Sequence, residues 1–239
     1  MSTVMAPAAP ALSSDRKFFT GAALVAAFIV AVGFAPTFYM RPASLGPLDP
    51  LLVVHGTIFT SWMLLFITQT ALIAADRRDL HRKLGVLGMV LAVAIPILGM
   101  AAAIHSLRLG RVPVPGLDPR QFFALPVQSM VNFSIFAASA LLMRRDVQTH
   151  KRLMLLAVFS MLGAALARWP VIGPYGPPAF FAVQDLLIAA ALIYDKRAHG
   201  HVHKAWKWGA AWFVLSEPLF LGLSGSPPWF AFADLLRGG

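Results

Sequence analysis

The chain has 239 residues, of which 58% are hydrophobic and only 13% are charged, about half the charged fraction of an ordinary soluble domain. The absence of cysteine excludes disulfides, thiolate catalysis and cysteine-ligated metal clusters. The 20 Lys and Arg residues outnumber the 10 Asp and Glu residues, but they gather in short loops beside apolar segments. That placement indicates anionic lipid headgroups, and not nucleic acid, as their partner. We therefore expect an integral membrane protein.

Seven apolar runs follow one another along the chain, and most have about the 20 residues that a helix needs to cross the hydrocarbon core of a bilayer. They are residues 18–40, 51–75, 84–106, 121–143, 152–169, 178–195 and 206–224. The sequence thus predicts an all-α bundle of seven transmembrane helices within residues 16–224. Residues 1–15 are expected to be a disordered tail, and residues 225–239 a short amphipathic segment on the outer face of the membrane.

Basic residues lie before the first run and in every second loop after it, which fixes the predicted orientation. The positive-inside rule places the N-terminus in the cytoplasm and the C-terminus outside. Two of these loops, RRDLHRKLG (77–85) and RRDVQTHKR (144–152), resemble each other, and the third places His203 before Lys204. Helices 2–3, 4–5 and 6–7 can therefore be interpreted as three related hairpins with helix 1 added. A shared basic composition explains the likeness as well.

The fourth run carries a stripe of polar side chains, formed by Gln121, Gln128, Asn132 and Ser139. At about 100° per residue these positions fall on one face of a helix. Because amides facing lipid are costly, the stripe is expected to face the bundle interior. It either hydrogen-bonds neighbouring helices or forms the wall of a wet cavity.

Further polar groups share a level near the outer boundary, about 6–10 Å deep or just above, at a rise of 1.5 Å per residue. They are His55, His105, Gln128, Arg168, Gln184, Asp185 and Glu217. An unpaired charge at membrane depth costs at least about 2.5–3.5 kcal/mol. One interpretation is a structural ion pair of Arg168 with Asp185 or Glu217. The other is a polar pocket that opens outward, with Arg168 as counter-ion or anion clamp.

Such a pocket could hold a redox or metal cofactor, for which two ligand sets can be drawn. One set consists of two histidine pairs, with His55 and His105 at the outer level and His81 and His150 at the inner level. This arrangement is typical of a membrane cytochrome that binds b-type haem. Alternatively, His55, Asp185 and Glu217 would hold a divalent metal ion. The HGHVH segment (199–203) lies in a basic loop and is better explained by adventitious metal affinity.

Two classes without such a cofactor stay open. The pocket could bind a quinone or lipid headgroup, as in a carrier. The chain could also lack chemistry of its own and act as a subunit or assembly factor of a larger membrane complex.

Several segments resemble a group of uncharacterised bacterial multi-pass inner-membrane proteins. They are VHGTIFTSWMLLFITQTALI (54–73), DLHRKLGVLGMVLA (79–92), THKRLMLLA (149–157) and ARWP (167–170). The resemblance covers about residues 50–220 and includes a His-Arg/Lys-x-Leu-Gly/Met element. It implies a location in the bacterial cytoplasmic membrane and assigns no catalytic residue.

Overall fold

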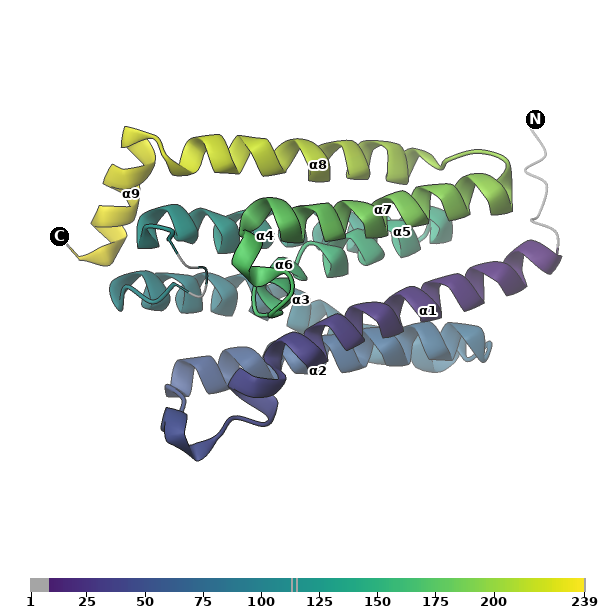
Figure 1. Cartoon of the computed structure of the whole chain (residues 1–239). Helices are drawn as coiled ribbons and strands as arrows, with labels where there is room; N and C mark the ends of the chain where they lie inside the picture. Colours follow the sequence, from purple (N-terminus) through teal and green to yellow (C-terminus); the bar gives the residue numbers. More distant parts are fainter. Residues whose placement is uncertain (1–8, 113, 115, 239) are drawn as a thin grey trace.

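The computed structural model describes residues 9–112, 114 and 116–238. In chain order the α-helices are α1 (Ala9–Phe34), α2 (Pro50–Ala74), α3 (Arg78–Arg108), α4 (Pro119–Leu142), α5 (Val147–Phe159), α6 (Gly163–Leu166), α7 (Pro177–His199), α8 (Lys204–Ser224) and α9 (Pro227–Arg237). A π-helical turn, η1 (Ala35–Tyr39), and two 3-10 turns, η2 (Ala43–Leu45) and η3 (Gly173–Tyr175), lie in the connections. In Figure 1 the long helices run alternately in opposite directions along one axis.

Six helical segments are long and apolar enough to cross a membrane, by length and composition. They are Ser14–Tyr39, Pro50–Ala74, Arg78–Arg108, Pro119–Leu142, Val147–Leu166 and Pro177–His199. The seventh predicted run forms α8, which lies beside α4 and α5 in the bundle but contains Lys207 and Glu217 and is not among the six. The all-α membrane bundle is therefore supported, with six candidate spans in place of the predicted seven.

The ends of the chain differ in part from the predicted tails. Helix α1 begins at Ala9, so residues 9–15 continue the first helix, where a disordered tail was expected. Residues 1–8 of that predicted tail lie outside the described residues. At the other end, α9 turns away from α8 and packs against α3 and α4 (Figure 1). Its Trp229 Nε1 donates a hydrogen bond to the carbonyl oxygen of Arg120 (2.7 Å), which ties this amphipathic segment to α4.

Local sequence sets where the helices begin. Proline stands in the first turn of α2, α4, α7 and α9, where a missing N–H costs nothing. Asp49, Asp118 and Asp146 each accept hydrogen bonds from backbone N–H groups of the helix that follows. Helix α7 ends at Gly200, whose φ of 76° favours glycine.

The centre of the bundle is α5, which packs against α1, α4, α7 and α8. In the segment Val147–Leu166, 72% of the most apolar stretch is buried, against 17% in α2. This segment is not one continuous helix, because the chain leaves the helical path at residues 160–162 before the single turn of α6. The fifth predicted run, 152–169, is thus a helix with a break in its outer half.

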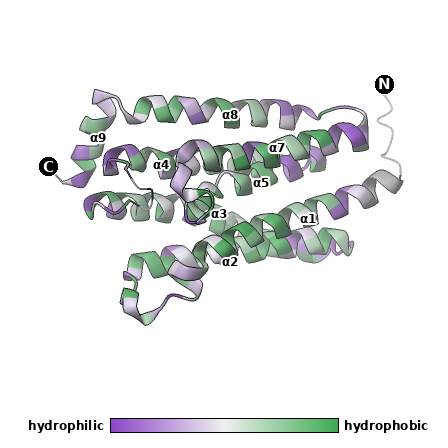
Figure 2. Cartoon of the chain, viewed as in Figure 1, coloured by the Kyte–Doolittle hydropathy of each residue, from purple (hydrophilic) through white to green (hydrophobic). Residues whose placement is uncertain are grey.

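Hydropathy divides the bundle along its axis. Figure 2 shows hydrophobic residues along the middle of the helices and hydrophilic residues toward the loops at both ends. We call the end with loops 75–77, 143–146 and 200–203 the basic end, and the end with α9 the far end. The predicted polar level of His55 and Arg168 lies in the far half.

Candidate functional site

A cavity of about 620 Å³ lies in the far half of the bundle. Its wall combines residues from α1, α2, α3, α4, the α5–α6 segment and α7, and is mostly apolar and aromatic. Six of the predicted polar residues also line it: His55, His105, Gln128, Asn132, Arg168 and Gln184. A cavity of this size, apolar with a few polar groups, is typical of small-molecule sites.

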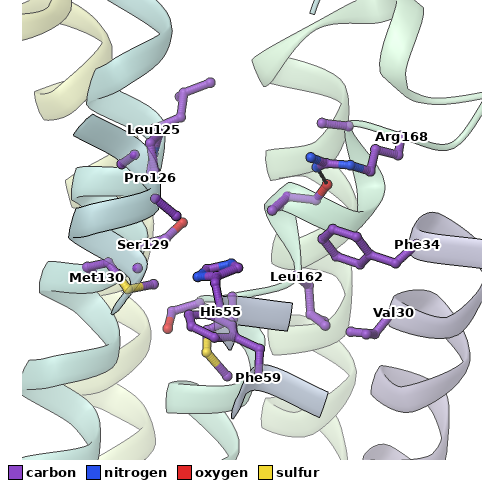
Figure 3. A pocket seen from close by; sticks show the side chains of 18 of the residues that line it. Val30, Phe34, His55, Phe59, Leu125, Pro126, Ser129, Met130, Leu162 and Arg168 are labelled. Carbon is purple, nitrogen blue, oxygen red and sulfur yellow. Dashed lines mark hydrogen bonds between the residues drawn. The ribbon is translucent and has the colours of Figure 1, made fainter. Parts of the chain in front are cut away.

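His55 projects into the cavity from the first turns of α2 (Figure 3). Its ring lies against Phe59, one turn further along the helix, with ring centroids 4.1 Å apart. Its Nδ1 atom is buried and has no hydrogen-bond partner among the described residues. A buried polar atom without a partner costs about 1–3 kcal/mol, so this nitrogen needs a ligand or water to satisfy it.

Arg168 enters the cavity from the opposite side, directly after the α6 turn (Figure 3). Its Nη1 donates a hydrogen bond to the carbonyl oxygen of Ala164 (2.6 Å), and its Cζ lies 4.6 Å from the ring centroid of Phe34. Within the described ranges it forms no ion pair, so of the two interpretations the structure does not show the pair of Arg168 with Asp185 or Glu217. Most of its N–H groups stay free to bind a ligand.

The polar stripe of α4 holds helices together. Gln128 Nε2 and Asn132 Nδ2 donate to the Ser216 hydroxyl of α8 (3.2 and 2.9 Å), and Trp212 Nε1 donates to Asn132 Oδ1 (2.9 Å). Gln184 Nε2 of α7 donates to the carbonyl oxygen of Phe159 (2.7 Å), at the point where α5 ends. Gln128 and Asn132 fit both interpretations of this stripe, because they bond side chains of α8 and also line the cavity.

Of the predicted outer histidine pair, His55 and His105, one member has a carboxylate neighbour. His105 Nε2 lies 3.3 Å from Asp49 Oδ2, an ion pair when the imidazole is protonated. Although both His55 and His105 line the cavity, only His55 lacks a charged neighbour of this kind in the part of the chain that the structure describes.

The predicted divalent metal set does not assemble. Among the described residues, no group of three or more His, Cys, Asp or Glu side chains could hold a metal ion. Asp185 and Glu217 lie outside the cavity wall, and one carboxylate oxygen of each is buried without a hydrogen-bond partner. His55 is therefore separate from both carboxylates.

The predicted inner pair does come together. His81 in the first turns of α3 and His150 in the first turns of α5 have ring centroids 6.5 Å apart, with ring planes at 86°. His150 Nδ1 lies 2.8 Å from the carbonyl oxygen of Ala140.

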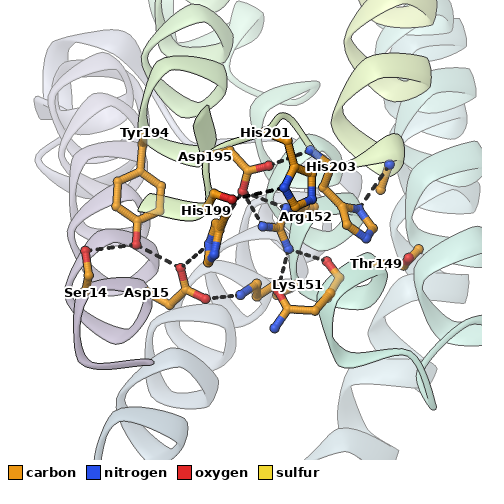
Figure 4. Close-up of polar contacts among 12 residues, drawn as sticks. Ser14, Asp15, Thr149, Lys151, Arg152, Tyr194, Asp195, His199, His201 and His203 are labelled. Atoms are coloured by element: carbon orange, nitrogen blue, oxygen red, sulfur yellow. Dashed lines mark hydrogen bonds and ion pairs between the residues drawn. The ribbon is translucent and has the colours of Figure 1, made fainter. Parts of the chain in front are cut away.

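An extensive polar network at the basic end was not predicted from the sequence (Figure 4). Asp195 on α7 forms an ion pair with Arg152 on α5 and accepts the backbone N–H of His203 (2.7 Å). Arg152 also donates to the side chain and the backbone of Gln148. Both members of the pair are almost fully buried, at 2% and 1% exposure of their side chains.

Asp15 of α1 is the second centre of that network. It is buried and pairs with Lys151 of α5, while Tyr194 OH (2.8 Å) and His199 Nε2 (3.0 Å) bind its other oxygen. No distinguishing signal was available in the sequence, because Asp76, Asp79 and Asp146 stand beside basic residues as Asp15 and Asp195 do. Helices α1, α5 and α7 are thereby joined at the basic end.

Comparisons with known proteins found no matching family model, curated protein or solved structure. The structure supports a multi-helix protein with six candidate membrane spans. A proposal for its function must therefore be argued from the cavity and its residues.

Proposed function

We propose that this protein is a seven-span protein of the bacterial cytoplasmic membrane that binds a lipid-soluble quinone in the far-half cavity. The proposal rests on the projection of His55 and Arg168 into one largely apolar cavity. Among the residues that the structure describes, His55 Nδ1 has no hydrogen-bond partner and Arg168 no carboxylate partner. The ligand that complements them has oxygen acceptors on an apolar body.

The free polar groups of the cavity favour a ring with carbonyl oxygens. Arg168 offers only N–H donors, and of the two ring nitrogens of His55 it is Nδ1 that lacks a partner among the described residues. Gln128, Asn132 and Gln184 are already engaged with other helices. Because the remaining wall is apolar and aromatic, including Phe34 and Phe59, it suits a flat headgroup and the start of an isoprenoid chain.

The geometry favours a quinone over a divalent metal ion in this cavity. His55 is the one histidine of the wall without a nearby carboxylate in the described structure, and no three-ligand group includes it. A quinone is held by hydrogen bonds to its two carbonyl oxygens. Unlike a metal ion, it does not need three or more ligating side chains. With respect to the membrane, we propose that the basic end faces the cytoplasm and the cavity the outer half of the bilayer.

Titration of purified protein in detergent with a ubiquinone analogue carrying a ten-carbon tail tests the proposal. His55→Ala and Arg168→Ala are each expected to weaken binding at least about tenfold, because each removes a hydrogen bond made in a buried site. Matched controls are His201→Ala and Arg145→Ala, which change the same residue types at exposed positions of the basic end.

Three results decide the matter. Unchanged affinity in folded His55→Ala and Arg168→Ala would overturn the proposal. Equal binding of palmitate, which offers a carboxylate and no ring, would identify the site as one for acyl lipids. Loss of binding in the cavity variants alone, with palmitate excluded, supports a quinone site.

A further inference from the structure

The π-helical turn η1 forms part of the wall of the far-half cavity, where α1 ends and the connection to α2 begins. Its Phe38 and Tyr39 both line the cavity. Such turns are rare and are found frequently at functional sites. The Arg41 guanidinium donates to the carbonyl oxygens of Leu45 (2.7 Å) and Gly46 (3.0 Å), so the chain that follows η1 is folded into a compact loop.

The Phe38 ring lies against α2 at Gly56, which is the one glycine of that helix. A Cβ added at Gly56 would lie 2.3 Å from Cε2 and 2.5 Å from Cζ of the ring. Carbon atoms in contact are about 3.5–4.0 Å apart, so the ring could not stay in its place. Because the clash is with the outer edge of a side chain and not with backbone, a larger residue would move the ring and leave α2 where it is.

Tyr39 joins the same stretch of α2 through a hydrogen bond. Its hydroxyl lies 2.9 Å from Thr60 Oγ1, one turn beyond Gly56. Thr60 Oγ1 already donates its one proton to the Gly56 carbonyl oxygen (2.7 Å), so Tyr39 is the donor of the pair. In the part of the chain that the structure describes, no backbone hydrogen bond joins η1 to α2. The wall between them therefore consists of side chains that can turn.

This part of the wall reaches the surface of the protein. Of the wall residues that the structure describes, three are exposed: Tyr39 at 43%, Arg111 and Ala164. Arg111 also lines a second cavity of about 420 Å³ together with Asp49, and the carbonyl oxygen of Ala164 binds Arg168. Charged groups thus border both of those places. Tyr39 instead lies beside α2, the least buried of the six candidate spans, so this edge faces lipid.

The proposed quinone needs an exit to lipid for its tail. The isoprenoid chain of a natural quinone is apolar and too long for the cavity, so it must continue into the bilayer. The chain is attached to the ring carbon beside a carbonyl carbon. It therefore leaves the headgroup close to a carbonyl oxygen, and the residue that we propose binds one, His55, directly precedes Gly56 in α2.

We propose that the tail of the bound quinone passes into the lipid between η1 and α2. Phe38 and Tyr39 form the gate of this exit, and Gly56 is a specificity-determining residue because it leaves the space that the Phe38 ring occupies. This inference rests on the proposed function, since the tail belongs to a headgroup held at His55 and Arg168.

A photoreactive quinone tests the route in the wild-type protein. The probe is a ubiquinone analogue with a diazirine midway along a ten-carbon tail. After illumination and digestion, mass spectrometry should find the label on η1 and on the turn of α2 that carries Thr60. An excess of the unmodified ten-carbon analogue should prevent this labelling. Label at Arg111 or on α6 instead would overturn the proposed exit.

The affinities of two quinones test the gate. Gly56→Ala displaces the Phe38 ring, so the ten-carbon analogue should bind at least about fivefold more weakly, whereas 2,3-dimethoxy-5-methylbenzoquinone, which has no tail, should keep its affinity. The double variant Gly56→Ala with Phe38→Ala should regain the affinity for the tail, because no ring remains to be displaced. The matched control is Gly99→Ala, whose Cβ would lie 2.2 Å from Met130 Sδ in another part of the wall. It should affect both quinones alike.

The outcomes separate the gate from the site that it serves. Equal losses for both quinones in Gly56→Ala, or a double variant no better than the single one, would overturn the gate and leave the cavity site in place. Failure of the proposed function has a different result, because binding of both quinones would then not respond to His55→Ala or Arg168→Ala, and the gate would fall with it. If Gly56→Ala does not fold, the labelling of the wild type decides.

Discussion

The Arg152 guanidinium and the Asp195 carboxylate form an ion pair enclosed on all sides, with Nε 3.0 Å from Oδ1. The pair joins the central helix α5 to α7 near the basic end (Figure 4). Removing one member of such a pair leaves the other charge buried and unpaired, whereas removing both does not.

Asp195→Asn is therefore expected to lower the free energy of unfolding by about 3–5 kcal/mol. The double variant Arg152→Leu with Asp195→Leu should be much closer to the wild type. Thermal unfolding in detergent, followed by tryptophan fluorescence, measures both. The control is Asp79→Asn in the exposed pair Arg77–Asp79, which should leave the melting temperature unchanged. Equal losses in the single and double Arg152–Asp195 variants would contradict this account.

Asp146 gives a pH-dependent prediction, since it caps α5 from the loop before it. The Thr149 hydroxyl, which donates to Oδ2 (2.6 Å), is the main cause that holds the pKa of Asp146 below its ordinary value, with the backbone N–H groups of Thr149 and Gln148 adding to it. A depressed pKa contributes stability above the unfolded value of about 3.9, and this contribution is lost as the pH falls through the folded value. Asp146→Ala should cost about 1 kcal/mol at pH 7.

The difference between wild type and Asp146→Ala should shrink as the pH falls below about 4. Unfolding measured at a series of pH values between 7 and 3 tests this. A difference of the same size across the whole series would show that the carboxylate charge has no part in the cap.

Gly33 marks the closest approach between α1 and the α6 turn. A Cβ at this position would lie 2.4 Å from the carbonyl oxygen of Ala165 and 2.9 Å from its Cα, both backbone atoms that cannot turn away. Gly33→Ala should thus destabilise the bundle by about 1–3 kcal/mol. Gly21→Ala, on the same helix with no atom within 4 Å of its Cβ, is the matched control. Indistinguishable melting temperatures would show that the two helices separate at little cost.

The absence of cysteine makes the proposed seven-span topology directly testable. A single cysteine at Arg145, in the basic end, should react with an impermeant maleimide only after spheroplasts are lysed. A cysteine at Leu235, 77% exposed on α9, should react in intact spheroplasts if α8 crosses the membrane. Protection of both positions until lysis would mean that α8 does not cross.

The helices could be predicted from sequence because hydropathy and flanking polar residues act locally. The predicted run 51–75 became Pro50–Ala74, and 121–143 became Pro119–Leu142. The run 84–106 grew to Arg78–Arg108, since polar residues before it continue the helix. The break after Phe159 was missed, because apolar residues run through it and the hydrogen bond that the Phe159 carbonyl oxygen accepts there comes from Gln184 on another helix.

The depth of the site residues along the bundle could also be predicted from the sequence, but the side chains that they contact could not. Depth along a helix follows from residue number, so His55 and Arg168 could be placed at one height. Which side chains meet depends on how each helix is rotated about its axis, which no local pattern fixes. The sequence therefore left open whether Arg168 pairs with Asp185 or Glu217 or faces a pocket, and it did not predict the pairing of Arg152 with Asp195.

The central position of α5 has a consequence for how the protein is made. Its segment has a mean hydropathy of 1.2, the lowest of the six, and carries Lys151 and Arg152 near one end. A ribosome delivers this helix to the membrane before α7, which brings Asp195. Until α7 follows, Arg152 lacks its Asp195 counter-ion, and its remaining hydrogen bonds among the described residues are those to Gln148 on α5 itself. A chain truncated after Tyr175 is therefore expected to leave α5 more open to proteolysis than in the full chain, because the helix that carries Asp195 is missing.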